Sequence, residues 1–117
     1  MLTKKQSGNM AKEAASRYLV SKGYKILERN YFARGGEIDI IAQDNDVLVF
    51  VEVKHRVTDF QGYGFQAVTK AKQHKICNAA KKYFFDKNLS WDRYMRFDVI
   101  DVFEGEITHY EGAFMLT

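Results

Sequence analysis

The sequence predicts a single α/β domain over residues 1–117, with a mixed central sheet flanked by helices. Two stretches have helical apolar spacing and five have the pattern of short strands, in the order α-β-β-β-α-β-β. Residues 47–53, Val-Leu-Val-Phe-Val-Glu-Val, are apolar almost without interruption, which is typical of a central strand covered on both faces. With 46% apolar residues, the chain can bury one sizeable core.

The first helix is predicted from about residue 9 to residue 22, with Gly23 at its C-terminal end. Its apolar stripe consists of Ala11, Ala14, Ala15, Tyr18 and Leu19. Three strands with short turns between them then form an antiparallel meander, expected over residues 24–32, 37–42 and 47–53.

The second half of the chain contains the longer predicted helix, from about Thr69 to residue 87. A loop containing glycines and aromatics precedes it at residues 59–65, and strands follow at 95–103 and 107–110. Because the helix makes a crossover connection, we expect the strands before and after it to run parallel.

Composition indicates a cytoplasmic protein without membrane contact. No apolar run approaches the ~20 residues that span a bilayer, and no apolar segment follows the basic N-terminus as in a secretory signal. The single cysteine, Cys77, cannot form an internal disulfide, and no Cys/His set has zinc spacing. The histidines His74 and His109 are expected at the surface.

Positive charge is concentrated before the C-terminal segment. Residues 104–117 contain three glutamates and neither Lys nor Arg. Since the net charge of the whole chain is +3, the residues before this segment carry a net charge of +6. The long helix is densest in lysine, and it presents a candidate phosphate-binding surface or an ordinary solvated face. The candidate nucleic-acid contacts are Lys70, Lys72 and Lys75.

Two acids lie inside apolar strands, where ionised carboxylates need a partner or a metal. Asp39 is flanked by isoleucines, and Glu52 lies between two valines. Lys54 follows two residues after Glu52, so both side chains project from the same strand face. Two carboxylates suit Mg²⁺ or Mn²⁺, and a neighbouring lysine can stabilise a phosphoryl transition state. An ordinary Glu–Lys ion pair is the alternative reading.

Two motifs in the sequence resemble those of a known family. They are residues 36–42, Gly-Glu-Ile-Asp-Ile-Ile-Ala, and residues 49–56, Val-Phe-Val-Glu-Val-Lys-His-Arg. They resemble the signature of the YraN-type bacterial family, which is similar to the archaeal Holliday junction resolvases and the PD-(D/E)XK nuclease superfamily. The resemblance covers nearly the whole chain. It implies a restriction-endonuclease-like αβββαβ core.

The resemblance also implies roles for individual residues. Asp39 and Glu52 match the metal-binding acids, Lys54 matches the catalytic lysine, and the Val53 carbonyl would complete the metal shell. Glu13 resembles an acid of the first helix found near the site in resolvase-like members, or is a solvated glutamate. A proline of the superfamily motif is replaced by Ile38, which removes no chemical group.

The leading functional hypothesis is a metal-dependent DNA endonuclease, with branched or otherwise structured DNA as the suggested substrate and Mg²⁺ or Mn²⁺ as cofactor. The alternatives are a nucleic-acid-binding module without effective catalysis and a protein-interaction subunit. The acid pair favours the enzyme over the binding module, because carboxylates repel phosphate. A homodimer is expected, since one such site hydrolyses one strand and paired incisions suit two sites.

Overall fold

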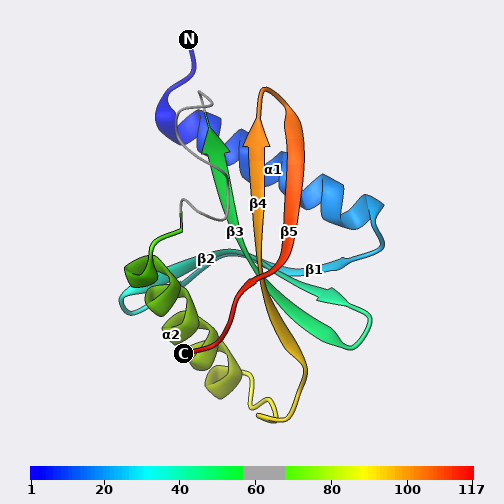
Figure 1. Cartoon of the computed structure of the whole chain (residues 1–117), viewed down its shortest axis with the longest axis vertical. Helices are drawn as coiled ribbons and strands as arrows, with labels where there is room; N and C mark the ends of the chain where they lie inside the picture. The colour runs from blue at the N-terminus through cyan, green and yellow to red at the C-terminus, as the bar shows by residue number, and fades with distance from the viewer. Residues whose placement is uncertain (57–67) are drawn as a thin grey trace.

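The computed structural model describes residues 1–56 and 68–117 and shows one five-stranded sheet with a helix on each face (Figure 1). In chain order, the elements are α1 (Lys4–Ser21), β1 (Lys25–Ala33), β2 (Gly36–Asp44), β3 (Val47–Arg56), α2 (Lys70–Asp86), β4 (Met95–Phe103) and β5 (Glu106–Phe114). The loop predicted at 59–65 lies outside the described residues. Within the described ranges, neither helix is long and apolar enough to cross a membrane.

The sheet order is β1-β2-β3-β4-β5, with β3 in the centre. The first three strands form the predicted antiparallel meander. β3 and β4 are parallel, as the crossover through α2 requires, and β5 returns antiparallel to β4. Residues 48–51 of β3 are fully buried, so the prediction of a central strand is confirmed.

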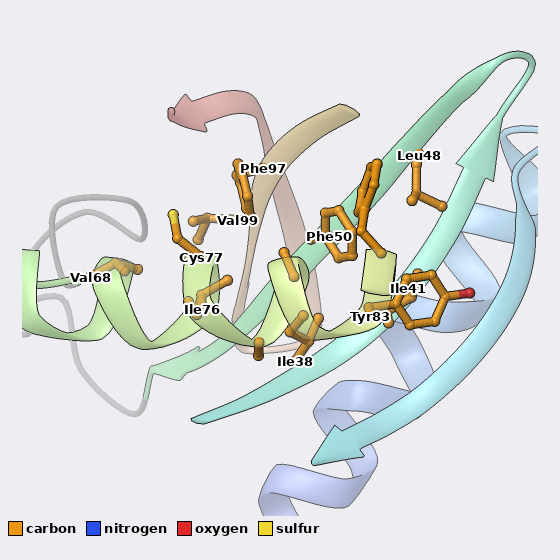
Figure 2. Close-up of a cluster of buried hydrophobic side chains, with 13 residues drawn as sticks. Ile38, Ile41, Leu48, Phe50, Val68, Ile76, Cys77, Tyr83, Phe97 and Val99 are labelled. Atoms are coloured by element: carbon orange, nitrogen blue, oxygen red, sulfur yellow. The ribbon is translucent and has the colours of Figure 1, made fainter. Parts of the chain in front are cut away.

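Alternation along the strands gives the sheet two apolar faces and therefore two cores. Phe50, Phe97 and Val99 lie on the α2 face and pack against helix residues that include Ile76 and Tyr83 (Figure 2). On the opposite face, α1 packs against residues that include Ile40, Val49, Val51 and Ile100. Cys77 is fully buried in the α2 core.

Two boundaries differ most from the sequence prediction. The first helix begins at Lys4, because Thr3 caps it: the Thr3 hydroxyl accepts from Gln6 N–H, and the Gln6 side chain accepts from Thr3 N–H. The polar first turn hides this start from a search for apolar periodicity. The last strand continues to Phe114, with Gly112 at φ +59° inside it.

Gly36 allows α2 to lie directly against the start of β2. A Cβ at this position would be 2.6 Å from the carbonyl oxygen of Lys75 and 3.1 Å from its carbonyl carbon. Only glycine permits that approach without displacing backbone. The glycine that opens the first motif therefore helps to place α2 beside the strand that carries Asp39.

Candidate metal-binding and catalytic site

The two predicted acids meet across β2 and β3. Ile40 pairs with Val51, so the next position in this antiparallel register sets Asp39 opposite Glu52. Their side chains are almost inaccessible, with residue exposures of 7% and 5%, and the carboxyl groups are hydrogen-bonded to each other. The β2–β3 hairpin brings these two groups together.

Asp39 is held by one backbone and one side-chain donor. The Val53 N–H donates to Asp39 Oδ2 over 2.7 Å. Lys12 of α1 lies with its Nζ 3.4 Å from Asp39 Oδ1 and 3.3 Å from a Glu37 carboxylate oxygen. Burial alone would lower the pKa of Lys12, but the two carboxylates raise it, so Lys12 is a cation beside the site.

Glu52 is the titrating member of the pair. Burial first, and then the hydrogen bond and negative charge of Asp39, raise its pKa to about 8. Lys72 of α2, with its Nζ 3.5 Å from Glu52 Oε2, and Lys54 both oppose that rise. The pair therefore shares a proton at neutral pH, as expected for two carboxyls that cannot both ionise.

Lys54 lies further along the same face of β3, next to a second buried acid. In the parallel register it pairs with Asp101 of β4, which is 1% exposed. Arg56 donates from Nε to both Asp101 oxygens, over 2.8 and 3.0 Å. Asp101 is thus already neutralised. His55 lines a small cavity with Ala11 of α1, on the opposite face from Lys54.

Glu13 is engaged elsewhere. It accepts from Arg29 over 2.7 Å and from Arg17 over 3.3 Å, and the Arg29 hydrogen bond lowers its pKa. As a metal ligand it would have to leave those ion pairs, so that role stays a prediction. Of the three candidate phosphate contacts, the structure brings Lys72 to the site and leaves Lys70 and Lys75 exposed on α2.

The donor set fits a hard cation but is small. Across residues 1–56 and 68–117, no group of three or more His, Cys, Asp or Glu side chains has metal-site spacing. A site here would therefore consist of Asp39, Glu52, the Val53 carbonyl and waters, which matches the preference of Mg²⁺ for few protein ligands. The two carboxyl groups on adjacent strands provide oxygen ligands of the kind that such a cation prefers.

A second polar cluster, which the sequence did not predict as a unit, lies on the α1 face. Asp98, fully buried, accepts from Arg96, from the Gly112 N–H over 3.0 Å and, at 2.6 Å, pairs with His109 Nε2. The expectation of a surface His109 is wrong, because its side chain is only 7% exposed; its Nδ1 is 3.1 Å from the Tyr18 hydroxyl. Strand alternation around Asp98 was the available signal.

This combination of fold and site defines a class: an αβββαβ core of the restriction-endonuclease type with an acid pair on its second and third strands. The chain belongs to the uncharacterised protein family UPF0102, whose family model matches residues 11–102. The resemblance to the YraN-type family is therefore confirmed.

Relatives match along nearly the whole chain. A UPF0102 protein of Sulfurihydrogenibium sp. is 44% identical over 98% of this chain and 99% of its own length. One of Clostridioides difficile is 43% identical over 97% of this chain and all of its own. The UPF0102 protein YraN of Salmonella newport is 40% identical over 97% of this chain and 87% of its own.

Proposed function

We propose that this protein is a metal-dependent DNA endonuclease with Asp39, Glu52 and Lys54 as its catalytic residues. The observation that carries the proposal is the buried carboxyl pair on adjacent strands, with Lys54 on the same face. A purely structural role gives no reason to bury two acids against each other, because the arrangement disfavours their charged forms. A carboxyl whose pKa is raised as strongly as that of Glu52 is characteristic of functional sites.

Each residue has a distinct task in this proposal. Asp39, fixed by the Val53 N–H, and Glu52 would hold Mg²⁺ or Mn²⁺ together with the Val53 carbonyl. The bound cation would supply Lewis acidity toward a phosphate and a nearby water. Lys54 would place its ammonium against the phosphate as negative charge develops. Glu52 must release its shared proton before it can serve as a ligand.

In this proposal, the lysines around the acids help to bind the DNA. Lys12 and Lys72 lie within 3.5 Å of the two carboxyl groups. They partly neutralise the acids and so reduce the repulsion that a DNA phosphate would meet. Lys70 and Lys75 extend the same positive surface along α2. Branched DNA as the substrate and a homodimer as the active form remain predictions.

The same lysines support a second candidate: a nucleic-acid-binding module without effective catalysis. An acid pair that shares a proton and has a cation beside each member is satisfied without a metal. In that case DNA would bind and no divalent cation would be required. Metal binding separates the two candidates.

The decisive experiment combines calorimetry with a cleavage assay. We expect Mn²⁺ to bind wild type, and Mg²⁺ or Mn²⁺ to support cutting of one or more linear, nicked, flapped or four-way DNA substrates. Asp39→Asn should abolish both. Glu106→Gln, an exposed acid at the start of β5, is the matched control and should change neither. Equal cutting by wild type and Asp39→Asn would contradict the proposal. DNA binding without metal binding or cutting would establish the binding module.

The α2 contacts are tested by salt dependence. Replacing Lys70, Lys72 and Lys75 by alanine should flatten the slope of log affinity against log salt by up to about 0.9 per lost duplex contact. Equivalent substitutions at the exposed lysines Lys4, Lys5 and Lys25 should leave the slope unchanged. Equal slopes for both triple variants would exclude the α2 lysines from the interface.

A further inference from the structure

A groove opens on the sheet where β4 begins and β5 ends. It has a volume of about 390 Å³ and lies between the start of β4, the end of β5 and the residues that follow α2. Its apolar lining includes Met95, Phe97 and Phe114. Phe97 also belongs to the α2 core, so the groove lies at the margin of that core.

Trp91 forms one wall of the groove. Its indole stacks on Phe84 with ring centroids 5.0 Å apart and an interplanar angle of 13°. One face of the indole is therefore fixed against the core, yet 59% of the residue is exposed. Tyr94, close in sequence, is 74% exposed. A rigid aromatic ring with a free face is the element on which unpaired bases stack.

The charge of the lining is positive. Arg93 and Arg96 are its only ionisable residues within the described ranges, and no acid lines it. Arg96 is engaged by Asp98, Asp44 and Glu111. Arg93 has no ion-pair partner in the described part of the chain. A groove with an open aromatic face and an unneutralised guanidinium suits a ligand that combines flat rings with negative charge.

The groove and the acid pair lie on the same face of the sheet. Phe97 packs in the α2 core together with Val99, and Val99 is the register partner of Glu52. Met95 lies four residues before Val99 on β4, which is roughly 13 Å along an extended strand. The side chains of Phe97 and Val99 on this path are buried under α2, so a bound strand that reached both places would pass around that helix.

We propose that this groove binds a single-stranded segment of the nucleic-acid substrate, with one unpaired base stacked on Trp91 and its phosphate beside Arg93. This inference deepens the proposed function and rests on it. It assigns the protein a contact for unpaired nucleotides in addition to the acid pair, and it thereby predicts preference for substrates with a flap or a gap over intact duplex.

Trp91 is the single tryptophan of the chain, so its fluorescence reports on this groove alone. In metal-free buffer, we expect a short oligothymidylate to quench Trp91 emission to saturation. An abasic oligomer of equal length, which offers the same phosphates without bases, should quench far less. Equal quenching by the two oligomers would overturn the inference.

Affinity for labelled oligothymidylate, measured by anisotropy, provides the second arm. Trp91→Ala should weaken binding about 5- to 20-fold, as expected for the loss of one stacked base, and Trp91→Phe should retain part of it. Phe85→Ala removes a comparably exposed aromatic outside the groove and should bind like wild type. Circular dichroism melts identify any variant that fails to fold, and Trp91→Phe preserves the packing on Phe84.

Three results would overturn the inference. The first is equal affinity of wild type, Trp91→Ala and Trp91→Phe. The second is a dimer in sedimentation that Trp91→Ala dissociates, since the groove would then be a contact between copies of this chain. In the third, wild type cuts DNA with metal while Trp91 does not respond, which would remove this contact and leave the proposed function intact. Failure to bind any DNA would remove both.

Discussion

Asp98 and Glu52 are both buried carboxyls on neighbouring strands, but their surroundings shift their pKa values in opposite directions. Asp98 accepts hydrogen bonds from Arg96 and from a backbone N–H, and it pairs with His109. Burial alone would raise the pKa of Asp98, but these donors lower it. Glu52 faces another acid, and its pKa rises to about 8.

The difference separates a structural cluster from a candidate functional site. The charge of Asp98 is fully compensated by its hydrogen-bond and ion-pair partners. Its cluster connects β4 to β5 and to α1 and needs no further ligand. The charge of Glu52 is compensated only in part by lysines at the edge of the site. Because the site disfavours the ionised form of Glu52, an added cation would stabilise that form. Asp98 needs no such cation.

Removing the charge of Asp98 should produce the largest effect. Asp98→Asn leaves Arg96 and His109 without their anionic partner, and breaking a buried pair of this kind costs about 3–5 kcal/mol of unfolding free energy. Since the folded pKa of Asp98 lies below its ordinary value of 3.8, its stabilisation is present above that pH and is lost as pH falls through the folded pKa.

Urea unfolding at several pH values measures this cost. The gap between wild type and Asp98→Asn should be widest near neutral pH and should narrow below pH 3.8. Equal stability of the two proteins at pH 7 would place Asp98 outside the structural role argued above.

Lys54 is expected to affect chemistry and leave stability nearly unchanged. Lys54→Ala should lower the cutting rate by on the order of 10²–10³, as for other preorganised electrostatic donors. The fold should survive, because Lys54 lies where the apolar run of β3 ends and only partial burial is lost. Single-turnover cleavage and thermal melting of the same preparation test both halves. A lower melting temperature with an unchanged cutting rate would show that Lys54 contributes to stability and not to catalysis.

The pattern of the strands made the Asp39–Glu52 pair predictable from sequence. The groups that tertiary contacts bring to this pair could not be predicted in the same way. Asp39 and Glu52 stood out because each interrupts an apolar strand, and their turn fixed the register. The lysine nearest Asp39 came from α1, where Lys12 is one of several polar residues on a helix surface. Nothing local distinguishes it from Lys4 or Lys5.

The Asp98 cluster shows the same limit. Its members come from α1, β4 and β5, and their separations reach 91 residues between Tyr18 and His109. Only the packed sheet brings them together. Gly36 was noticed as part of a motif, but its role depends on how closely α2 approaches, which the strand pattern does not encode.

Glu52→Gln should have the opposite sign to Asp98→Asn. The folded pKa of Glu52, about 8, exceeds its ordinary value of 4.5, so wild-type stability falls as pH rises from 4.5 toward 8. Glutamine keeps a donor to Asp39 and cannot ionise. It should stabilise the protein by roughly 2–3 kcal/mol at pH 8, given about 1.4 kcal/mol per pKa unit and partial relaxation of the site.

Thermal melts at pH 4 and pH 8 measure the Glu52→Gln effect, which should nearly vanish at pH 4. Metal binding should be lost in the same variant. A destabilised Glu52→Gln protein at pH 8 would show that Glu52 is ionised and well compensated, like Asp98, and would remove the contrast between the two clusters.

Gly36→Ala is the smallest expected change, and it tests whether close packing of α2 supports the site. The added Cβ would meet the Lys75 carbonyl oxygen at 2.6 Å, so the start of β2 or the middle of α2 must shift. Overpacking of this kind costs about 1–3 kcal/mol. The shift also acts on Lys72, one turn before Lys75 on α2, and on its contact with Glu52.

Two readouts separate strain from a site effect in Gly36→Ala. Urea unfolding reports the loss of stability, and the salt slope of DNA binding reports whether Lys72 still faces the site. Gly8→Ala is the matched control, because a Cβ there meets nothing within 4 Å and alanine favours the helix. Gly8→Ala should be neutral or slightly stabilising. If Gly36→Ala behaved in the same way, the approach of α2 to β2 would be looser than its backbone contact indicates, and Gly36 would have no part in positioning Lys72.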